Sequence, residues 1–173
     1  MFKYEELKEI HTMKTLRRLI FVVGVLVIGN FFGTGICYAE SIELSQGQTV
    51  YVPVYSHIYV VRGHAFDLGI SLSIRNTDPA KSITILSANY NDSAGNLVRT
   101  YLESPIQLNP LASTDFFVSE SDTAGGLGAS FLVKWKSTGM VNEPIIEGVM
   151  VGTRSGQGIS FVTRGKAIKD GAK

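Results

Sequence analysis

The chain has 173 residues, which favours a single domain. It carries 16 Lys and Arg against 15 Asp and Glu, a net charge of +1, with no long basic run, so nucleic acid is not an expected partner. Its single cysteine excludes an intrachain disulfide.

The first 39 residues have the pattern of a secretory signal peptide. Basic residues precede a short apolar run at 20–28, and small residues stand at Cys37 and Ala39. We therefore expect a signal helix over residues 1–39 and cleavage after Ala39. A start at Met13 would give the usual signal-peptide length, so residues 1–12 are expected to be an over-extended gene start.

Two alternatives to cleavage follow from the same residues. The apolar run could stay as an inner-membrane anchor, but Gly29 and Asn30 interrupt it well before about 20 apolar residues. Cys37 could carry a lipid, although Ile36 is a poor neighbour for that modification because lipoprotein signals place a small residue there. Cleavage, and hence a periplasmic or secreted protein, is the preferred prediction.

The mature chain would run from Glu40 to Lys173 as one domain. It has 11 Lys and Arg and 12 Asp and Glu, a net charge of −1, and no cysteine. It therefore has no thiolate to act as a nucleophile or a metal ligand, and packing must supply its stability.

Short strands with turn signals between them fill the first half of this domain. Residues 50–61 are rich in Tyr and Val and contain Pro53, which predicts an edge or bent strand. Residues 66–75 alternate strictly and predict one antiparallel strand with a wet face. Residues 83–90, with a suspected bulge, and 97–102 predict a hairpin. The two prolines in 103–111 predict a crossing between sheets.

The second half is arranged around residues 119–137. A short strand at 114–118 leads into an acidic, Gly-rich loop at 119–128, and the following strand alternates up to Trp135, the only tryptophan. Residues 139–144 predict a loop, 145–151 a central strand and 159–164 the last strand, followed by a frayed tail from residue 166.

This pattern predicts an all-β fold, an immunoglobulin-like antiparallel β-sandwich over residues 40–173 with Trp135 between its sheets. A small barrel is the alternative. No long period of 3.6 occurs after the signal segment.

Several stretches are similar to one bacterial family, the domain of unknown function 3124. The similarity covers nearly all of the mature chain and rests on VYVPVYSHIY (50–59), LSIRNTDP (72–79), YNDSAG (90–95), ESDTAGGLGASFLVKW (120–135) and GISFVTRG (158–165). The resemblance implies a short exported bacterial protein. It supplies no catalytic residues that could be transferred to this chain.

Metal binding is one chemistry that the mature sequence allows. His57, His64, Met140 and Met150 are ligand types that suit copper or zinc, and the histidines flank a predicted turn. No compact ligand motif joins them. We favour the interpretation that the histidines end strands and turns while the methionines fill the core, and we expect no cofactor.

The Gly-rich loop offers hard oxygen ligands at Glu120 and Asp122, but the spacing does not match a calcium loop. The same acids could perform acid–base chemistry, yet neighbouring loop acids are commonly only solvated. No G-x-S-x-G motif is present, and Gly125 to Gly128 lacks the lysine of a phosphate-binding loop. These observations favour a protein that is not an enzyme.

Tyr51, Tyr55 and Tyr59 could stack on a sugar ring or receive an added strand at an open sheet edge. We therefore expect an exported, non-enzymatic binding or interaction module for a protein or cell-envelope ligand. Its binding surface is expected at the 119–128 loop, with Glu120 and Asp122, or at the Tyr-rich edge. A periplasmic copper or zinc protein is the alternative.

Overall fold

The computed structural model describes residues 13, 17, 43–154 and 156–169. The chain divides into two compact units, residues 1–41 and 42–173. The predicted signal helix and its cleavage point fall almost entirely outside the described residues. Within the described part of the chain, no helix has the length and apolar character needed to cross a membrane.

Strands dominate the described residues. In chain order they are β1 (Leu44–Pro53), β2 (His57–Val61), β3 (His64–Asp67), β4 (Gly69–Arg75), β5 (Ile83–Asn91), β6 (Leu97–Thr100), β7 (Ile106–Leu108), β8 (Ser113–Val118), β9 (Ser130–Asn142), β10 (Ile145–Arg154), β11 (Gln157–Arg164) and β12 (Lys166–Ile168).

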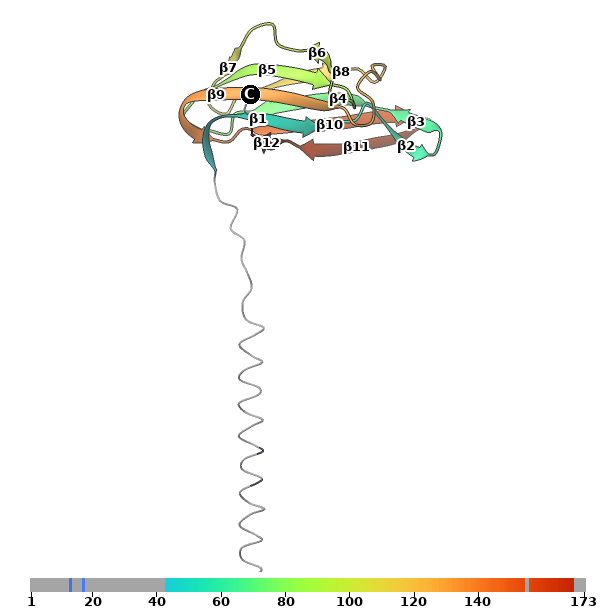
Figure 1. Cartoon of the computed structure of the whole chain (residues 1–173), viewed down its shortest axis with the longest axis horizontal. Coiled ribbons are helices and arrows are strands. Elements are labelled where there is room, and N and C mark those ends of the chain that lie inside the picture. The colour runs from blue at the N-terminus through green and yellow to red at the C-terminus, as the bar shows by residue number, and fades with distance from the viewer. Residues whose placement is uncertain (1–12, 14–16, 18–42, 155, 170–173) are drawn as a thin grey trace, which may run out of the picture. The chain divides into compact units, whose positions relative to one another are not determined.

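These strands form two main sheets that pack face to face (Figure 1). One has six strands in the order β12-β1-β9-β5-β6, with β7 also paired to β5, and the other has four in the order β11-β10-β4-β8. A separate hairpin joins β2 to β3. The strand pairs are antiparallel, so the predicted all-β antiparallel architecture is confirmed.

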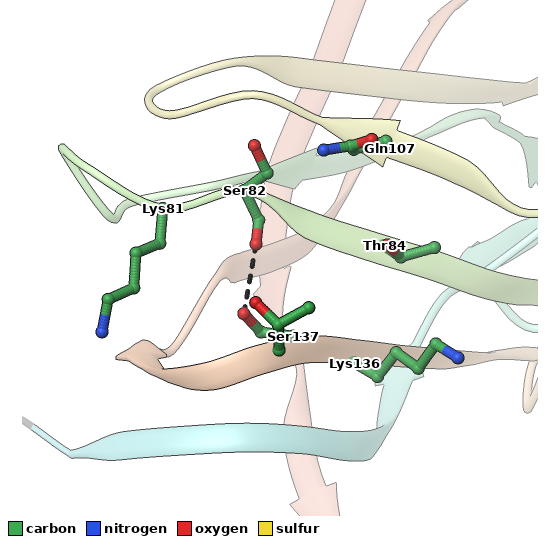
Figure 2. A pocket seen from close by; sticks show the side chains of 7 residues that line it. Lys81, Ser82, Thr84, Gln107, Lys136 and Ser137 are labelled. Atoms are coloured by element: carbon green, nitrogen blue, oxygen red, sulfur yellow. Dashed lines mark hydrogen bonds between the residues drawn. The ribbon is translucent and has the colours of Figure 1, made fainter.

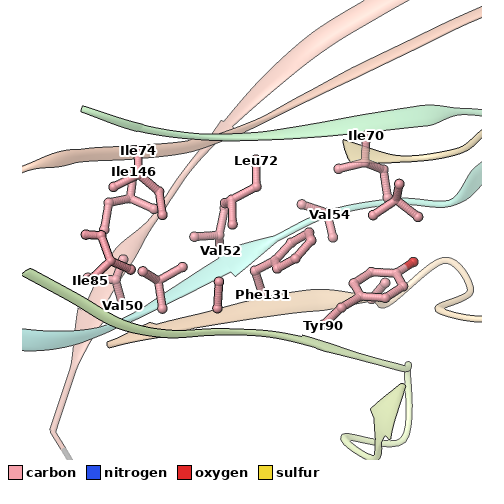
Figure 3. Close-up of a cluster of buried hydrophobic side chains, with 14 of the residues drawn as sticks. Val50, Val52, Val54, Ile70, Leu72, Ile74, Ile85, Tyr90, Phe131 and Ile146 are labelled. Atoms are coloured by element: carbon pink, nitrogen blue, oxygen red, sulfur yellow. The ribbon is translucent and has the colours of Figure 1, made fainter. Parts of the chain in front are cut away.

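The core lies between the two sheets, where the inward side chains of both meet (Figure 3). On β9 the predicted alternation is confirmed: Phe131, Val133 and Trp135 are at most 1% exposed. On β4 the alternating residues Ile70 and Leu72 are fully buried as predicted. Burying one such large apolar side chain stabilises the fold by about 1.5–3 kcal/mol, so this interface is the main source of stability.

Two predicted loops are strands in the structure. Residues 139–142, expected in a loop, continue β9 and pair with the start of β1 across a bulge between Ser45 and Gly47. Residues 166–168, expected to fray, form β12 and pair with Thr49 to Tyr51 of β1. In both places backbone pairing with β1, rather than the local sequence pattern, decides the conformation.

The prediction that residues 50–61 form the edge of a sheet is therefore wrong for β1. β9 and β12 flank β1 on its two sides at Thr49 to Tyr51, and Pro53 ends the strand, where its missing N–H costs least. The predicted single strand at 66–75 is divided at Leu68 into β3 and β4, and the predicted crossing at 103–111 contains the short strand β7. The suspected bulge in β5 is confirmed between Ile85 and Ser87.

A buried polar turn follows β4 and ties both sheets together at one end. The Asn76 side chain is 2% exposed and donates hydrogen bonds to the Lys81 and Asn109 carbonyls at 2.8 and 2.9 Å. Asp78 accepts from the backbone amides of Lys81 (2.8 Å) and Asn142 (3.1 Å). These bonds satisfy buried backbone groups that would otherwise be costly to remove from water.

Because of Asp78 in this turn, the stability of the fold depends on pH. Backbone hydrogen bonds, first from Ala80 and then from Asn142, lower the pKa of Asp78 below its ordinary 3.8. A carboxyl with a lowered folded pKa contributes stability that is complete above its unfolded pKa and is lost as pH falls through the folded value.

We expect Asp78→Asn to weaken the fall in stability below about pH 4, because the variant has no carboxylate to protonate. Urea unfolding at pH 6 and pH 3 measures this slope. A hydrogen bond from Asn96 also lowers the pKa of Asp92, so the Asp78→Asn variant should keep a residual dependence of stability on pH. Asp92→Asn is the matched control. A slope unchanged by Asp78→Asn would contradict the assignment.

Candidate functional site

An open groove of about 510 Å³ lies on the outer face of the six-stranded sheet (Figure 2). Its walls come from the segment before β5 and from β5, β7 and β9. The lining residues are Lys81, Ser82, Thr84, Gln107, Lys136, Ser137 and Thr138. The lining is thus two ammonium groups, four hydroxyls and one amide, without an acidic or aromatic side chain.

Strand register brings these residues together. Thr84 lies opposite Gln107 on β7 and opposite Lys136 on β9, so the three side chains form one row across the sheet. The next position in this row is Gly47 on β1. Because glycine has no side chain, Lys136 has no side-chain neighbour on that side of the row. A Cβ at Gly47 would lie 2.7 Å from the Trp135 carbonyl oxygen, so the bulged backbone requires glycine there.

Hydrogen bonds hold the groove in shape. Ser137 donates to the Ser82 carbonyl at 3.1 Å, and Lys81 Nζ donates to the Met140 carbonyl at 2.8 Å. Lys81 and Lys136 extend in opposite directions, with Ser137 between them (Figure 2). The positive charge of Lys81 also helps to lower the pKa of Asp78, whose carboxylate already accepts hydrogen bonds from backbone amides. The groove therefore offers one ammonium at each end and hydroxyls between.

The acidic 119–128 loop, one of the two expected binding surfaces, closes one end of the core. Ser93, in the β5–β6 turn, donates to the Gly125 carbonyl at 3.0 Å and accepts from the Gly128 amide at 2.9 Å. Gly126 has a φ of 76°, a left-handed conformation that favours glycine. The Ser93 hydroxyl thus fixes the backbone of the loop to the β5–β6 turn.

The two predicted loop acids have different environments. Asp122 accepts a hydrogen bond from Arg99 at 3.1 Å and another from the Ala124 amide at 3.2 Å, so it is already occupied. Arg99 also donates to the Tyr101 hydroxyl at 3.3 Å. Glu120 is exposed and is not part of this cluster. The structure therefore does not unite Glu120 and Asp122 in one site.

Beneath the loop, Tyr90 is fully buried, with its ring centroid 5.1 Å from that of Phe131. Its hydroxyl makes no hydrogen bond of ordinary geometry, although the Gly125 backbone lies close enough to favour the ionised form slightly. Burial, followed by the charge of Asp122, raises the pKa of Tyr90 to about 12. Sequence reasoning missed this residue, because its alternation marks it only as core.

The three predicted tyrosines do not form one surface. Tyr51 lies on β1 and is 38% exposed, and Tyr59 lies on the β2–β3 hairpin and is 55% exposed. Tyr55 packs against the core, with its ring edge-on to Phe161 at 5.7 Å. A sugar ring could therefore not stack on all three at once.

The predicted metal ligands are also dispersed. His57 lies opposite Asp67 at the open end of the β2–β3 hairpin, whereas His64 lies at its turn, opposite Val61. Met150 is fully buried in the core and Met140 is 46% exposed on β9. Among the described residues, no group of three His, Cys, Asp or Glu is placed to hold a metal ion.

His57 does contact one hydroxyl. Its Nδ1 lies 3.1 Å from Ser56 Oγ, and its ring stands edge-on to Tyr59 at 5.3 Å. Ser56 is fully buried, and its backbone amide donates to the Gly126 carbonyl. Ser56 therefore joins the start of the hairpin to the 119–128 loop, and His57 is half-buried beside it.

Comparison with known families decides what the chain is related to. The family described as "Protein of unknown function (DUF3124)" matches residues 47–168. The chain belongs to this family. The match includes the groove, the Asn76 turn and the 119–128 loop, and it confirms the resemblance inferred from the sequence motifs.

No curated protein matches the chain. Among solved structures, the chain is similar to one titled "Crystal Structure of Thermotoga maritima 1070". The two share 12% sequence identity with a TM-score of 0.40, over 69% of this chain and 92% of the other.

The raised pKa of Tyr90 predicts how the stability of the fold changes at alkaline pH. A tyrosine whose folded pKa is raised contributes stability that is complete below its unfolded pKa, near 10, and is lost as pH rises through about 12. Tyr90→Phe should therefore lose less stability than the parent between pH 8 and pH 11, measured by urea unfolding. At pH 8 it should be near-neutral, because the lost hydroxyl has no ordinary partner.

Tyr101→Phe is the matched control, since burial also raises the pKa of Tyr101 while Arg99 opposes the shift. It should change the alkaline slope less than Tyr90→Phe does. Equal slopes for the parent and for Tyr90→Phe would show that Tyr90 is not the titrating group.

Proposed function

We propose that the protein is an exported, non-enzymatic binding module whose groove on the six-stranded sheet holds an oxyanion-bearing ligand, a carboxylate or a phosphate. The observation that carries this proposal is the groove lining: Lys81 and Lys136 at its two ends, and hydroxyl and amide groups between them. This surface replaces the 119–128 loop and the Tyr-rich edge as the preferred binding region.

The chemistry of the lining supports an anionic ligand. A lysine ammonium acts as a point charge with three donors, and serine, threonine and glutamine side chains can complete the hydrogen bonds of an oxyanion or of hydroxyls attached to it. The lining contains neither histidine nor carboxylate to transfer a proton. A binding role fits this set of groups better than a catalytic one.

The expected affinity is modest. Both lysines are exposed, and an exposed ion pair contributes only about 0.2–1 kcal/mol. Binding of a small anion is therefore expected at about millimolar concentration, while a chain that carries repeated anions would bind more tightly.

Binding can be measured by NMR titration of the ¹⁵N-labelled protein with glucose 6-phosphate, glucuronate, inorganic phosphate and neutral glucose. We expect the amide signals of Lys136 and Ser137 to shift with the anions and not with glucose. About 1 M salt should abolish the shifts, because the Debye length then falls to about 3 Å. Shifts with inorganic phosphate alone would indicate a site for free phosphate that takes neither carboxylates nor sugar phosphates, and shifts of equal size with glucose would contradict an anion site.

Lys81→Gln combined with Lys136→Gln should remove these shifts without unfolding the protein. The control is Arg62→Gln with Lys169→Gln, which makes the same change in charge at two exposed residues outside the groove. If both double variants weaken binding equally, only net charge matters and the groove is not the site.

Export is supported by the basic-apolar-small pattern of residues 1–39. We propose that the protein is periplasmic or secreted. The alternative is that an uncleaved signal segment anchors it to the inner membrane. Mass spectrometry of protein recovered from the cell envelope should find Glu40 as the first residue. An intact N-terminus at Met1 or Met13 in membrane fractions would instead favour an anchor.

The finer fold type is also part of this proposal. Repeated chain crossings between two antiparallel sheets, together with a buried Trp135 on the inner strand β9, support an immunoglobulin-like sandwich over residues 40–173.

A further inference from the structure

The outer face of the four-stranded sheet carries an exposed apolar patch. Phe117 on β8 is 60% exposed, Val162 on β11 is 55% exposed and Val151 on β10 is 49% exposed. The Phe117 ring lies over Gly69, where an added Cβ would stand 3.4 Å from its Cε2 atom. Neighbouring apolar side chains on one sheet face are typical of a surface that another protein covers.

Register places Val162 and Phe117 in one row across the sheet, and Val151 lies in the adjacent outward row. Val162 lies opposite Val149, Val149 opposite Ser71, and Ser71 opposite Phe117. The row therefore starts on one edge strand with Val162 and ends on the other with Phe117.

The next outward row on the other side is charged. Arg164 on β11 lies opposite Glu147, Glu147 opposite Ser73, and Ser73 opposite Asp115 on β8. Arg164 and Asp115 thus occupy the two edges of the row and carry opposite charges. Within the sheet Glu147 is already paired, at 3.8 Å, with Arg75.

This arrangement is complementary to itself. A twofold axis that runs parallel to the strands, between β10 and β4, exchanges β11 with β8 and keeps each row in place. Under this operation Arg164 meets Asp115 of a second copy, and Val162 meets Phe117. Each contact occurs twice, and neither places like charges opposite each other.

We propose that two copies of this chain pair through the outer faces of their four-stranded sheets, related by this twofold axis. The opposite charges at the ends of one row favour a second copy over an unrelated partner, because the same surface supplies both halves of each contact.

The size of the face sets the expected strength. Four strands spaced about 4.8 Å apart present a face roughly 20 Å wide, which corresponds to the smaller end of specific interfaces. We therefore expect a dimer that dissociates at about micromolar concentration and not a permanent one.

Sedimentation velocity of the exported protein, over about 1 to 500 μM, tests the proposal. The parent should shift from monomer to dimer with rising concentration. Phe117→Ser should weaken the dimer by at least about tenfold, since aromatic side chains that become buried commonly dominate such contacts. Phe117 is exposed in the monomer, so folding should be retained, and circular dichroism verifies this.

A charge exchange supplies the decisive variants. Asp115→Arg alone and Arg164→Asp alone each place like charges opposite each other and should weaken dimerisation by about tenfold. The double variant, Asp115→Arg with Arg164→Asp, restores opposite charges and should return the dissociation constant to within about threefold of the parent. Glu120→Arg, outside the face, should have no such effect.

Three results would overturn the proposal: a parent that stays monomeric over the whole range, a dimer insensitive to Phe117→Ser, or a double charge variant that is weaker than either single one. Because the groove lies on the opposite sheet, the anion titration reports on the proposed function independently of these outcomes.

Discussion

One strand holds the molecule together, because β9 pairs with β1 on one side and with β5 on the other. Its inward side chains, above all Trp135, fill the space between the sheets, and its outward lysine, Lys136, lines the groove. A slip of one residue in register would exchange these two faces. The core and the candidate site are therefore determined by the same set of backbone hydrogen bonds.

Polar groups secure the two ends of the sandwich. At one end, Asn76 and Asp78 bind backbone atoms from the segments around β5, β7 and β9. At the other, Ser93 joins the β5–β6 turn to the 119–128 loop above Tyr90. These bonds are directional, so they select one arrangement of the loops where apolar packing would permit several.

The two outer faces have different chemistry. The six-stranded sheet presents lysines and hydroxyls, while the four-stranded sheet presents an apolar row beside a row with opposite charges at its edges. Pairing through the second face would leave the first face open in both copies. Such a dimer would present two separate grooves that face away from each other.

The sequence alone determined the all-β class, the inward positions of Trp135 and of β4, and the family, because burial of alternate residues and turn chemistry are local signals. The tertiary structure decided the rest. Residues 166–168 become a strand only because they pair with β1, and Asp122 in the 119–128 loop is bound by Arg99, which is distant in sequence. The groove could not be predicted for the same reason: Lys81, Gln107 and Lys136 meet only through strand register, which no local pattern encodes.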